Sequence, residues 1–172
     1  GTGNVVLYID WYDKNANLIS TDNSSTVSAN TTWKSVTATK TSPSTASYAV
    51  LRFTFASGTY YIDQIAVQPS AYTDYDEARA IDIFLNPNKT NYINNPSFEV
   101  NVTDGWAIAG DDVTITQDTD VSDEVYSGSN SAKIVSSLPW SITSNPLPVE
   151  LGQYYVGSGF LKTDSNIQVS FN

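Results

Sequence analysis

The sequence predicts an all-β sandwich, and three observations support this fold class. Thr, Ser, Val, Tyr and Asn are abundant, short runs alternate apolar with polar residues, and Gly and Pro recur between these runs. Alternation with a period of two places every second side chain on the same face of a strand, so one face of each run can pack in a core. We therefore expect antiparallel sheets and little helix.

The first expected strand covers residues 5–12, where Val5, Leu7, Ile9 and Trp11 alternate with Val6, Tyr8, Asp10 and Tyr12. A turn rich in Asn and Asp follows, because these residues tolerate left-handed backbone, and a return strand begins at Leu18. After a polar stretch over residues 21–32, further strands are expected at residues 33–39, 48–55 and 60–67.

The pattern changes over residues 71–92. Ala78, Ile81 and Leu85 have the spacing of a helical face, acidic residues lie in the first turn and a proline follows, which predicts a short linker helix. The same segment also fits an extended linker, because Ile81, Ile83 and Leu85 alternate. After the linker, short strands are expected at residues 106–108, 113–116, 131–136, 147–151, 154–162 and 167–171.

The two ends of the chain carry a similar strand pattern. With Asn166 aligned on Asn4, an offset of 162 residues, Ile167, Val169 and Phe171 fall on Val5, Leu7 and Ile9. This alignment predicts that the chain ends in the strand with which it began, one repeat later. Because the chain has no Met and so no translation start, we expect it to be part of a longer protein.

Charge and composition disfavour several classes of function. A formal net charge of −10 repels phosphate backbones and anionic lipid headgroups. No apolar run approaches the roughly 20 residues that span a bilayer. The absence of His and Cys removes Ser-His-Asp triads, Cys-His pairs and His-liganded zinc. Since the acidic residues lie mostly in turns and the linker, no enzyme activity is expected.

Ordered motifs in the second half resemble the opening half of a carbohydrate-binding-module jelly roll. They are Asn94-Asn95-Pro96-Ser97-Phe98-Glu99, Asp104-Gly105-Trp106, Ser127-Gly128-Ser129-Asn130-Ser131-Ala132 and residues 151–160. The closing half of such a module resembles residues 7–13, Thr32-Trp33 and residues 60–67, which here come first.

This reversed order implies a division of the chain. Residues 1–70 resemble the C-terminal half of one jelly-roll module, residues 71–92 form the linker, and residues 93–172 resemble the N-terminal half of the next module. The resemblance also allows the two halves to associate as one permuted sandwich, within one chain or between neighbouring chains.

Similar modules occur in bacterial polysaccharide-degrading enzymes and along bacteriophage tail fibres, and the linker with its Asn-Pro-Ser-Phe-Glu start is more similar to the phage arrangement. The resemblance implies a structural and adhesive module of an extracellular virion tail appendage. Its partners would be neighbouring copies of the module and host-surface polysaccharide. The alternative is a carbohydrate-binding module of a secreted bacterial enzyme or adhesin.

The resemblance also implies a structural calcium ion. Its carboxylate ligands would be Glu99 and Asp63, completed by backbone carbonyls of a loop such as residues 127–130, since calcium takes six to eight oxygen ligands. The alternative is that both residues are hydrogen-bonded surface carboxylates.

Sugar recognition needs flat aromatic faces beside polar side chains. The candidates are Tyr8 and Tyr12 on the outward face of the first strand, Gln168 on the equivalent face of its repeat, and Trp140 in a loop after Pro139. A structural or merely exposed role is the alternative for these aromatic residues. Three other tryptophans match core positions of the resembled family: Trp11, Trp33 and Trp106.

Overall fold

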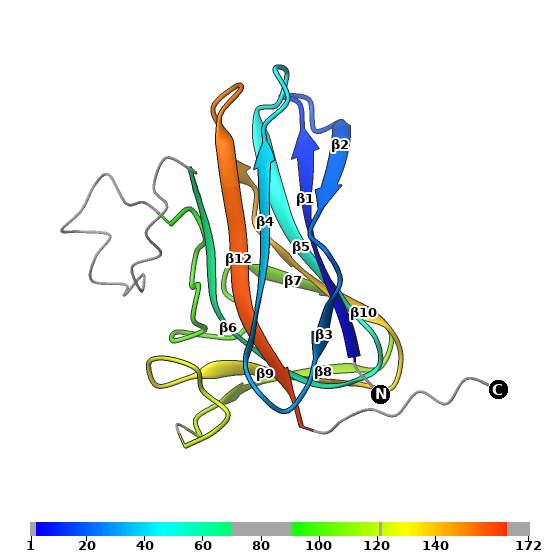
Figure 1. Cartoon of the computed structure of the whole chain (residues 1–172), viewed down its shortest axis with the longest axis vertical. Helices are drawn as coiled ribbons and strands as arrows, with labels where there is room; N and C mark the ends of the chain where they lie inside the picture. The colour runs from blue at the N-terminus through cyan, green and yellow to red at the C-terminus, as the bar shows by residue number, and fades with distance from the viewer. Residues whose placement is uncertain (1–2, 70–90, 121, 165–172) are drawn as a thin grey trace.

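The computed structural model describes residues 3–69, 91–120 and 122–164. Within these ranges the chain forms strands and no helix, and two antiparallel sheets pack against each other (Figure 1). The predicted all-β sandwich is therefore confirmed. The expected linker helix, the expected strand 167–171 and the candidate Gln168 lie outside the described residues. Over the same ranges, no helix has the length and hydropathy needed to cross a membrane.

The first sheet has the strand order β2-β1-β5-β10-β7, with two short strands paired at its sides. Its members are β1 (Gly3–Tyr12), β2 (Leu18–Asn23), β5 (Tyr48–Phe55), β7 (Trp106–Ala109) and β10 (Trp140–Ser144), with β3 (Val27–Ala29) on β1 and β11 (Leu147–Pro148) on β5. The second sheet has the order β4-β12-β6-β9-β8. It contains β4 (Lys34–Thr41), β6 (Gly58–Pro69), β8 (Val113–Asp118), β9 (Ser131–Ser136) and β12 (Tyr154–Thr163).

Eight of these strands pair in a nested pattern. Taken in the order β9, β10, β12, β1, β2, β4, β5, β6, the first strand pairs with the last, the second with the seventh, the third with the sixth and the fourth with the fifth. All four pairings are antiparallel. This nesting of pairs across two sheets is the jelly-roll arrangement.

Both sheets contain strands from each of the two predicted halves. In the first sheet, β5 pairs with β10, and in the second, β12 lies between β4 and β6. Each sheet of the sandwich is thus built from residues before and after the linker, and the two halves share one core.

The core follows the alternation seen in the sequence. Val5, Leu7, Ile9 and Trp11 are buried as predicted, and burial of one such side chain contributes about 1.5–3 kcal/mol. Gly157 of β12 lets the sheets approach closely, because a Cβ there would lie 2.8 Å from Cδ1 of Leu51 in the opposite sheet.

Most strand predictions are confirmed, and the errors are local. The predicted strands 48–55 and 131–136 have the observed bounds of β5 and β9. Two strands were missed: β3 lies inside the polar stretch, and β10 begins at Trp140, which was expected in a loop. The strand expected at 147–151 is limited to Leu147–Pro148. Pairing with a neighbouring strand, which sequence patterns do not reveal, defines these short elements.

Candidate functional site

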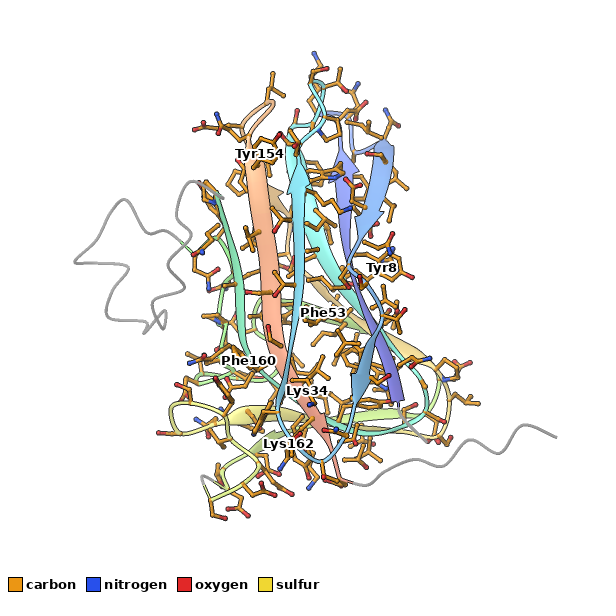
Figure 2. The ribbon with its side chains drawn as sticks, in the orientation of Figure 1. Tyr8, Lys34, Phe53, Tyr154, Phe160 and Lys162 are labelled. Carbon is orange, nitrogen blue, oxygen red and sulfur yellow. The ribbon has the colours of Figure 1, made fainter. Side chains whose placement is uncertain are left out.

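The outer face of the first sheet carries the sugar-binding candidates of β1. Because the odd-numbered residues of β1 point into the core, Tyr8 and Tyr12 point outward and remain half-buried. The structure thus confirms that they share one solvent-facing surface, and Figure 2 shows Tyr8 on β1.

Two residues of β5 complete an aromatic and polar surface around these tyrosines. Tyr48 is the cross-strand partner of Tyr12, and Arg52 is the partner of Tyr8. The rings of Tyr12 and Tyr48 are stacked, with centroids 5.2 Å apart and planes 8° from parallel. The Arg52 guanidinium carbon lies 4.4 Å from the Tyr8 ring centroid, a distance typical of a cation–π contact.

Asp10 fixes the position of Arg52. Arg52 Nε donates to Asp10 Oδ2 at 2.8 Å and Nη2 donates to Oδ1 at 3.0 Å. The hydroxyl of Thr21 on β2 also donates to Asp10, at 2.7 Å. Hydrogen bonding to Asp10 raises the pKa of Arg52. The result is a bidentate pair whose donors are held in one orientation between the aromatic rings.

The aromatic row continues to both sides of Tyr12 and Tyr48. Leu18 of β2 is the partner of Tyr12, and Pro148 of β11 is the partner of Tyr48. Both side chains are exposed. Four adjacent strands therefore present an apolar row at one end of the sheet, next to the locked Asp10–Arg52 pair. Flat apolar surface beside fixed hydrogen-bonding groups is the combination that binds sugar rings. We call these six residues (Tyr8, Asp10, Tyr12, Leu18, Tyr48 and Arg52) the tyrosine face.

Tyr48, Arg52 and Asp10 were not predicted from the sequence as members of this surface. The alternation within residues 48–55 identifies Tyr48 and Arg52 as outward-facing. Their place beside Tyr12 and Tyr8 follows only from the register between β5 and β1, two strands separated by β2, β3 and β4 in the sequence.

Trp140 does not belong to this surface. It is the first residue of β10, is only 3 % exposed, and stacks on Phe55 with ring centroids 4.0 Å apart. The expectation of a loop position was wrong, because pairing of β10 with β5 directs the indole into the core. Trp11 and Trp106 are also buried, as the resemblance implies, whereas Trp33 is half-buried and lies just before β4.

The predicted calcium ligands, Asp63 and Glu99, meet at one loop between β8 and β9. Asp63 Oδ2 accepts the N–H groups of Tyr126 at 3.0 Å and Ser127 at 2.9 Å. Beyond Gly128, Glu99 Oε1 accepts the N–H groups of Ser129 at 2.9 Å and Asn130 at 3.2 Å. The two carboxylates therefore hold consecutive stretches of the same loop.

The backbone near these carboxylates adopts positive φ angles, which residues other than glycine rarely take. Gln64, next to Asp63, has φ 47°, and Asn95 and Phe98, just before Glu99, have φ 50° and 56°. A β-bulge interrupts the pairing of β6 with β12 at Gln64. Surrounding contacts must stabilise such strained backbone, and strain of this kind is most frequent at functional sites.

Burial dominates the titration of Asp63. The carboxyl group is fully buried, which raises its pKa to about 7, while the N–H groups of Ser127, Gln64 and Tyr126 act in the opposite direction. The nearby negative charge of Glu99 raises the pKa further. Peptide N–H groups of Gln64, Tyr126 and Ser127 stabilise the Asp63 carboxylate.

The donors around the two carboxylates do not fit a calcium ion in this arrangement. Asp63 Oδ1 also accepts the Gln64 N–H at 2.7 Å, and Glu99 Oε2 accepts the side-chain amide of Asn130 at 2.9 Å. Six N–H donors thus point to where a cation needs oxygen ligands. In the described part of the chain, no three acidic side chains come together as a metal site. Calcium binding would require the loop peptides to turn their carbonyls toward the carboxylates.

Comparison of the chain with family models, curated proteins and solved structures found no match. The fold and the geometry of its surfaces therefore provide the arguments about function. They define a jelly-roll β-sandwich with a polar and aromatic face on its first sheet.

Proposed function

We propose that this protein is a carbohydrate-binding, adhesive module of an extracellular appendage such as a phage tail fibre. The alternative setting is a secreted bacterial enzyme or adhesin that carries the module. In both settings the tyrosine face binds a polysaccharide chain and the protein performs no reaction on it.

One observation carries the proposal: Tyr12 and Tyr48 stack across two strands, beside an arginine that Asp10 holds in place. A rigid site has already lost the side-chain freedom that ligand binding would otherwise remove, so the locked Arg52 favours binding. The nested strand pairs also support the proposal. The sequence motifs resemble those of carbohydrate-binding modules, and such modules have a jelly-roll fold.

The charges favour an uncharged glycan. The cation of the tyrosine face, Arg52, is already paired with Asp10, so it leaves no free positive charge for an acidic sugar. The net charge of −10 adds long-range repulsion of anionic polysaccharides. The paired Arg52 guanidinium, whose side chain is 30 % exposed, still has N–H groups for sugar hydroxyls.

The test is titration calorimetry with soluble neutral oligosaccharides chosen from a glycan array. Replacing Tyr12 and Tyr48 together by Ala removes the stacked pair, and we expect affinity to fall at least about tenfold, which corresponds to roughly 1.4 kcal/mol. Tyr154→Ala is the matched control, since Tyr154 is an exposed strand tyrosine on the second sheet. Unchanged affinity in the double variant, with both variants folded, would refute the role of the tyrosine face.

A further inference from the structure

A second cluster of aromatic side chains lies on the outer face of the other sheet. It consists of Trp33 before β4, Tyr126 in the loop between β8 and β9, and Phe160 on β12, and we call it the tryptophan corner. The resemblance to carbohydrate-binding modules implied a core position for Trp33, but its side chain is half-buried at the surface. Figure 2 shows Phe160 and Lys162 near one end of β12, with Tyr154 near the other.

The rings of the tryptophan corner form two planes. Tyr126 stacks on Phe160, with centroids 3.9 Å apart and planes 13° from parallel. Trp33 meets Tyr126 at 65° with centroids 5.6 Å apart. Tyr126 remains 40 % exposed although Phe160 covers one of its faces. Two aromatic planes that meet at a steep angle, with solvent access to both, provide a surface on which a sugar ring can stack.

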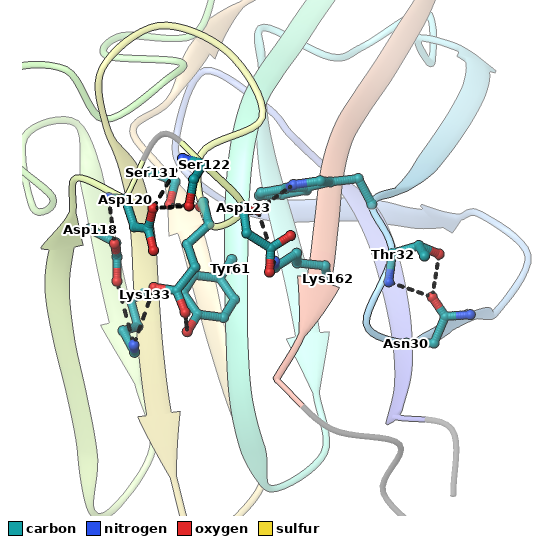
Figure 3. Close-up of polar contacts among 12 residues, drawn as sticks. Asn30, Thr32, Tyr61, Asp118, Asp120, Ser122, Asp123, Ser131, Lys133 and Lys162 are labelled. Atoms are coloured by element: carbon teal, nitrogen blue, oxygen red, sulfur yellow. Dashed lines mark hydrogen bonds and ion pairs between the residues drawn. The ribbon is translucent and has the colours of Figure 1, made fainter.

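Trp33 and Lys162 hold the loop at Asp123 in place. Trp33 Nε1 donates to the backbone carbonyl of Asp123 at 3.2 Å. The buried Lys162 amine donates to the same carbonyl at 2.8 Å and lies 2.8 Å from the Asp123 carboxylate (Figure 3). Lys162 Nζ also lies 5.9 Å from the Trp33 ring centroid. The loop is thus fixed against the sheet by a residue whose own carboxylate is 76 % exposed.

Asp63 holds the backbone of Tyr126. Its carboxylate accepts the Tyr126 N–H at 3.0 Å, and Asp63 is the cross-strand partner of Phe160 on which Tyr126 stacks. Asp63 therefore holds the backbone from which the Tyr126 ring projects onto Phe160. This arrangement is more than an exposed apolar patch, because a buried carboxylate and a buried amine orient its aromatic and polar groups.

We infer that the tryptophan corner is a second carbohydrate site, in which Tyr126 and Trp33 stack on an uncharged pyranose ring and the exposed carboxylate of Asp123 accepts its hydroxyl protons in hydrogen bonds. A neutral ligand fits because the lysine of the corner is buried and already paired with Asp123. The inference shares its ligand class with the proposed function but uses the opposite sheet, so each site is tested separately.

Tryptophan fluorescence of the full chain provides a direct test. Of the four tryptophans, Trp11, Trp106 and Trp140 are buried and Trp33 is half-buried and reachable from solvent. Acrylamide quenching therefore reports mainly on Trp33. Titration with cellohexaose, mannohexaose and maltohexaose should include at least one sugar that shifts the emission and reduces quenching. If no sugar of this panel protects Trp33, the inference is wrong, whether or not the tyrosine face binds.

Three variants separate this site from the tyrosine face. Tyr126→Ala should weaken the binding that protects Trp33 by about tenfold, equivalent to roughly 1.4 kcal/mol, and Asp123→Asn should weaken it less because the amide keeps an acceptor oxygen. The Tyr12→Ala and Tyr48→Ala double variant should leave protection of Trp33 unchanged. Protection that survives Tyr126→Ala, or that disappears in the double variant, would overturn the inference. Thermal unfolding of each variant checks that it is folded.

Discussion

Three carboxylates of this protein hold other groups in place. Asp10 orients Arg52 on one sheet, and Asp63 and Glu99 hold the peptide groups of one loop on the other. An ionised carboxylate binds such donors strongly, because hydrogen bonds with a charged partner are about twice as strong as neutral ones.

This use of the carboxylates predicts that calcium does not stabilise the fold. A cation present at 100 times its Kd would add about 2.7 kcal/mol to the free energy of unfolding. Because six N–H donors already satisfy Asp63 and Glu99, we expect the same melting temperature in EDTA and in millimolar calcium chloride. Differential scanning calorimetry measures both. A clear rise of the melting temperature with calcium would show that the loop peptides reverse to bind the ion.

Among the elements, β12 carries two glycines that face the opposite sheet. It lies between β4 and β6, and its residues Gly157 and Gly159 face Leu51 and Phe53 of the opposite sheet. The side chains of Leu51 and Phe53 fill the space opposite these glycines, and larger residues on β12 would occupy the same space. The glycines therefore set the distance between the sheets at the centre of the sandwich.

Gly157→Ala should destabilise the protein by about 1–3 kcal/mol, since the added methyl group overpacks the contact with Leu51. The matched change Gly159→Ala should cost less, because its nearest neighbour would be 3.3 Å away rather than 2.8 Å. Urea denaturation followed by circular dichroism measures both. Equal stability of the two variants would contradict the assigned close approach at Gly157.

Across the whole molecule, the strands follow the order of a jelly roll if β12 is taken to continue into β1. In the sequence the two strands are at opposite ends, and Figure 1 shows the end of β12 and the start of β1 at the same end of the sandwich. The chain therefore has the strand arrangement of a jelly roll with its order circularly permuted.

A circular permutant tests this arrangement. The ends are joined through residues 165–172 and 1–2, and the chain is opened within residues 70–90. We expect the same far-ultraviolet circular dichroism spectrum and a melting temperature within about 5 °C, because strand pairing is kept and compact domains tolerate permutation. A permutant opened inside β6 should not fold, since β6 lies at the centre of the second sheet. Failure of the permutant opened within residues 70–90 to fold would refute the proposed continuation of β12 into β1.

Strand positions were predictable because a buried strand imposes a period of two on its own residues. Residues 48–55 and 131–136 show this pattern, and so do Tyr8 and Tyr12 on the outer face of β1. Trp140 was misplaced because the residues of β10 are defined by their neighbour β5. The tryptophan corner was missed because its three rings come from residues far apart in the chain and meet only when the loop folds over the sheet.

Local alternation thus specifies that this chain forms antiparallel sheets and which side chains point outward, because those properties depend on near neighbours along the backbone. The tertiary structure decides which distant side chains become neighbours: Tyr12 with Tyr48, Trp33 with Tyr126, and Asp63 with Glu99 at one loop. Strand register and sheet order set these contacts, and both depend on the packing of distant segments in a common core.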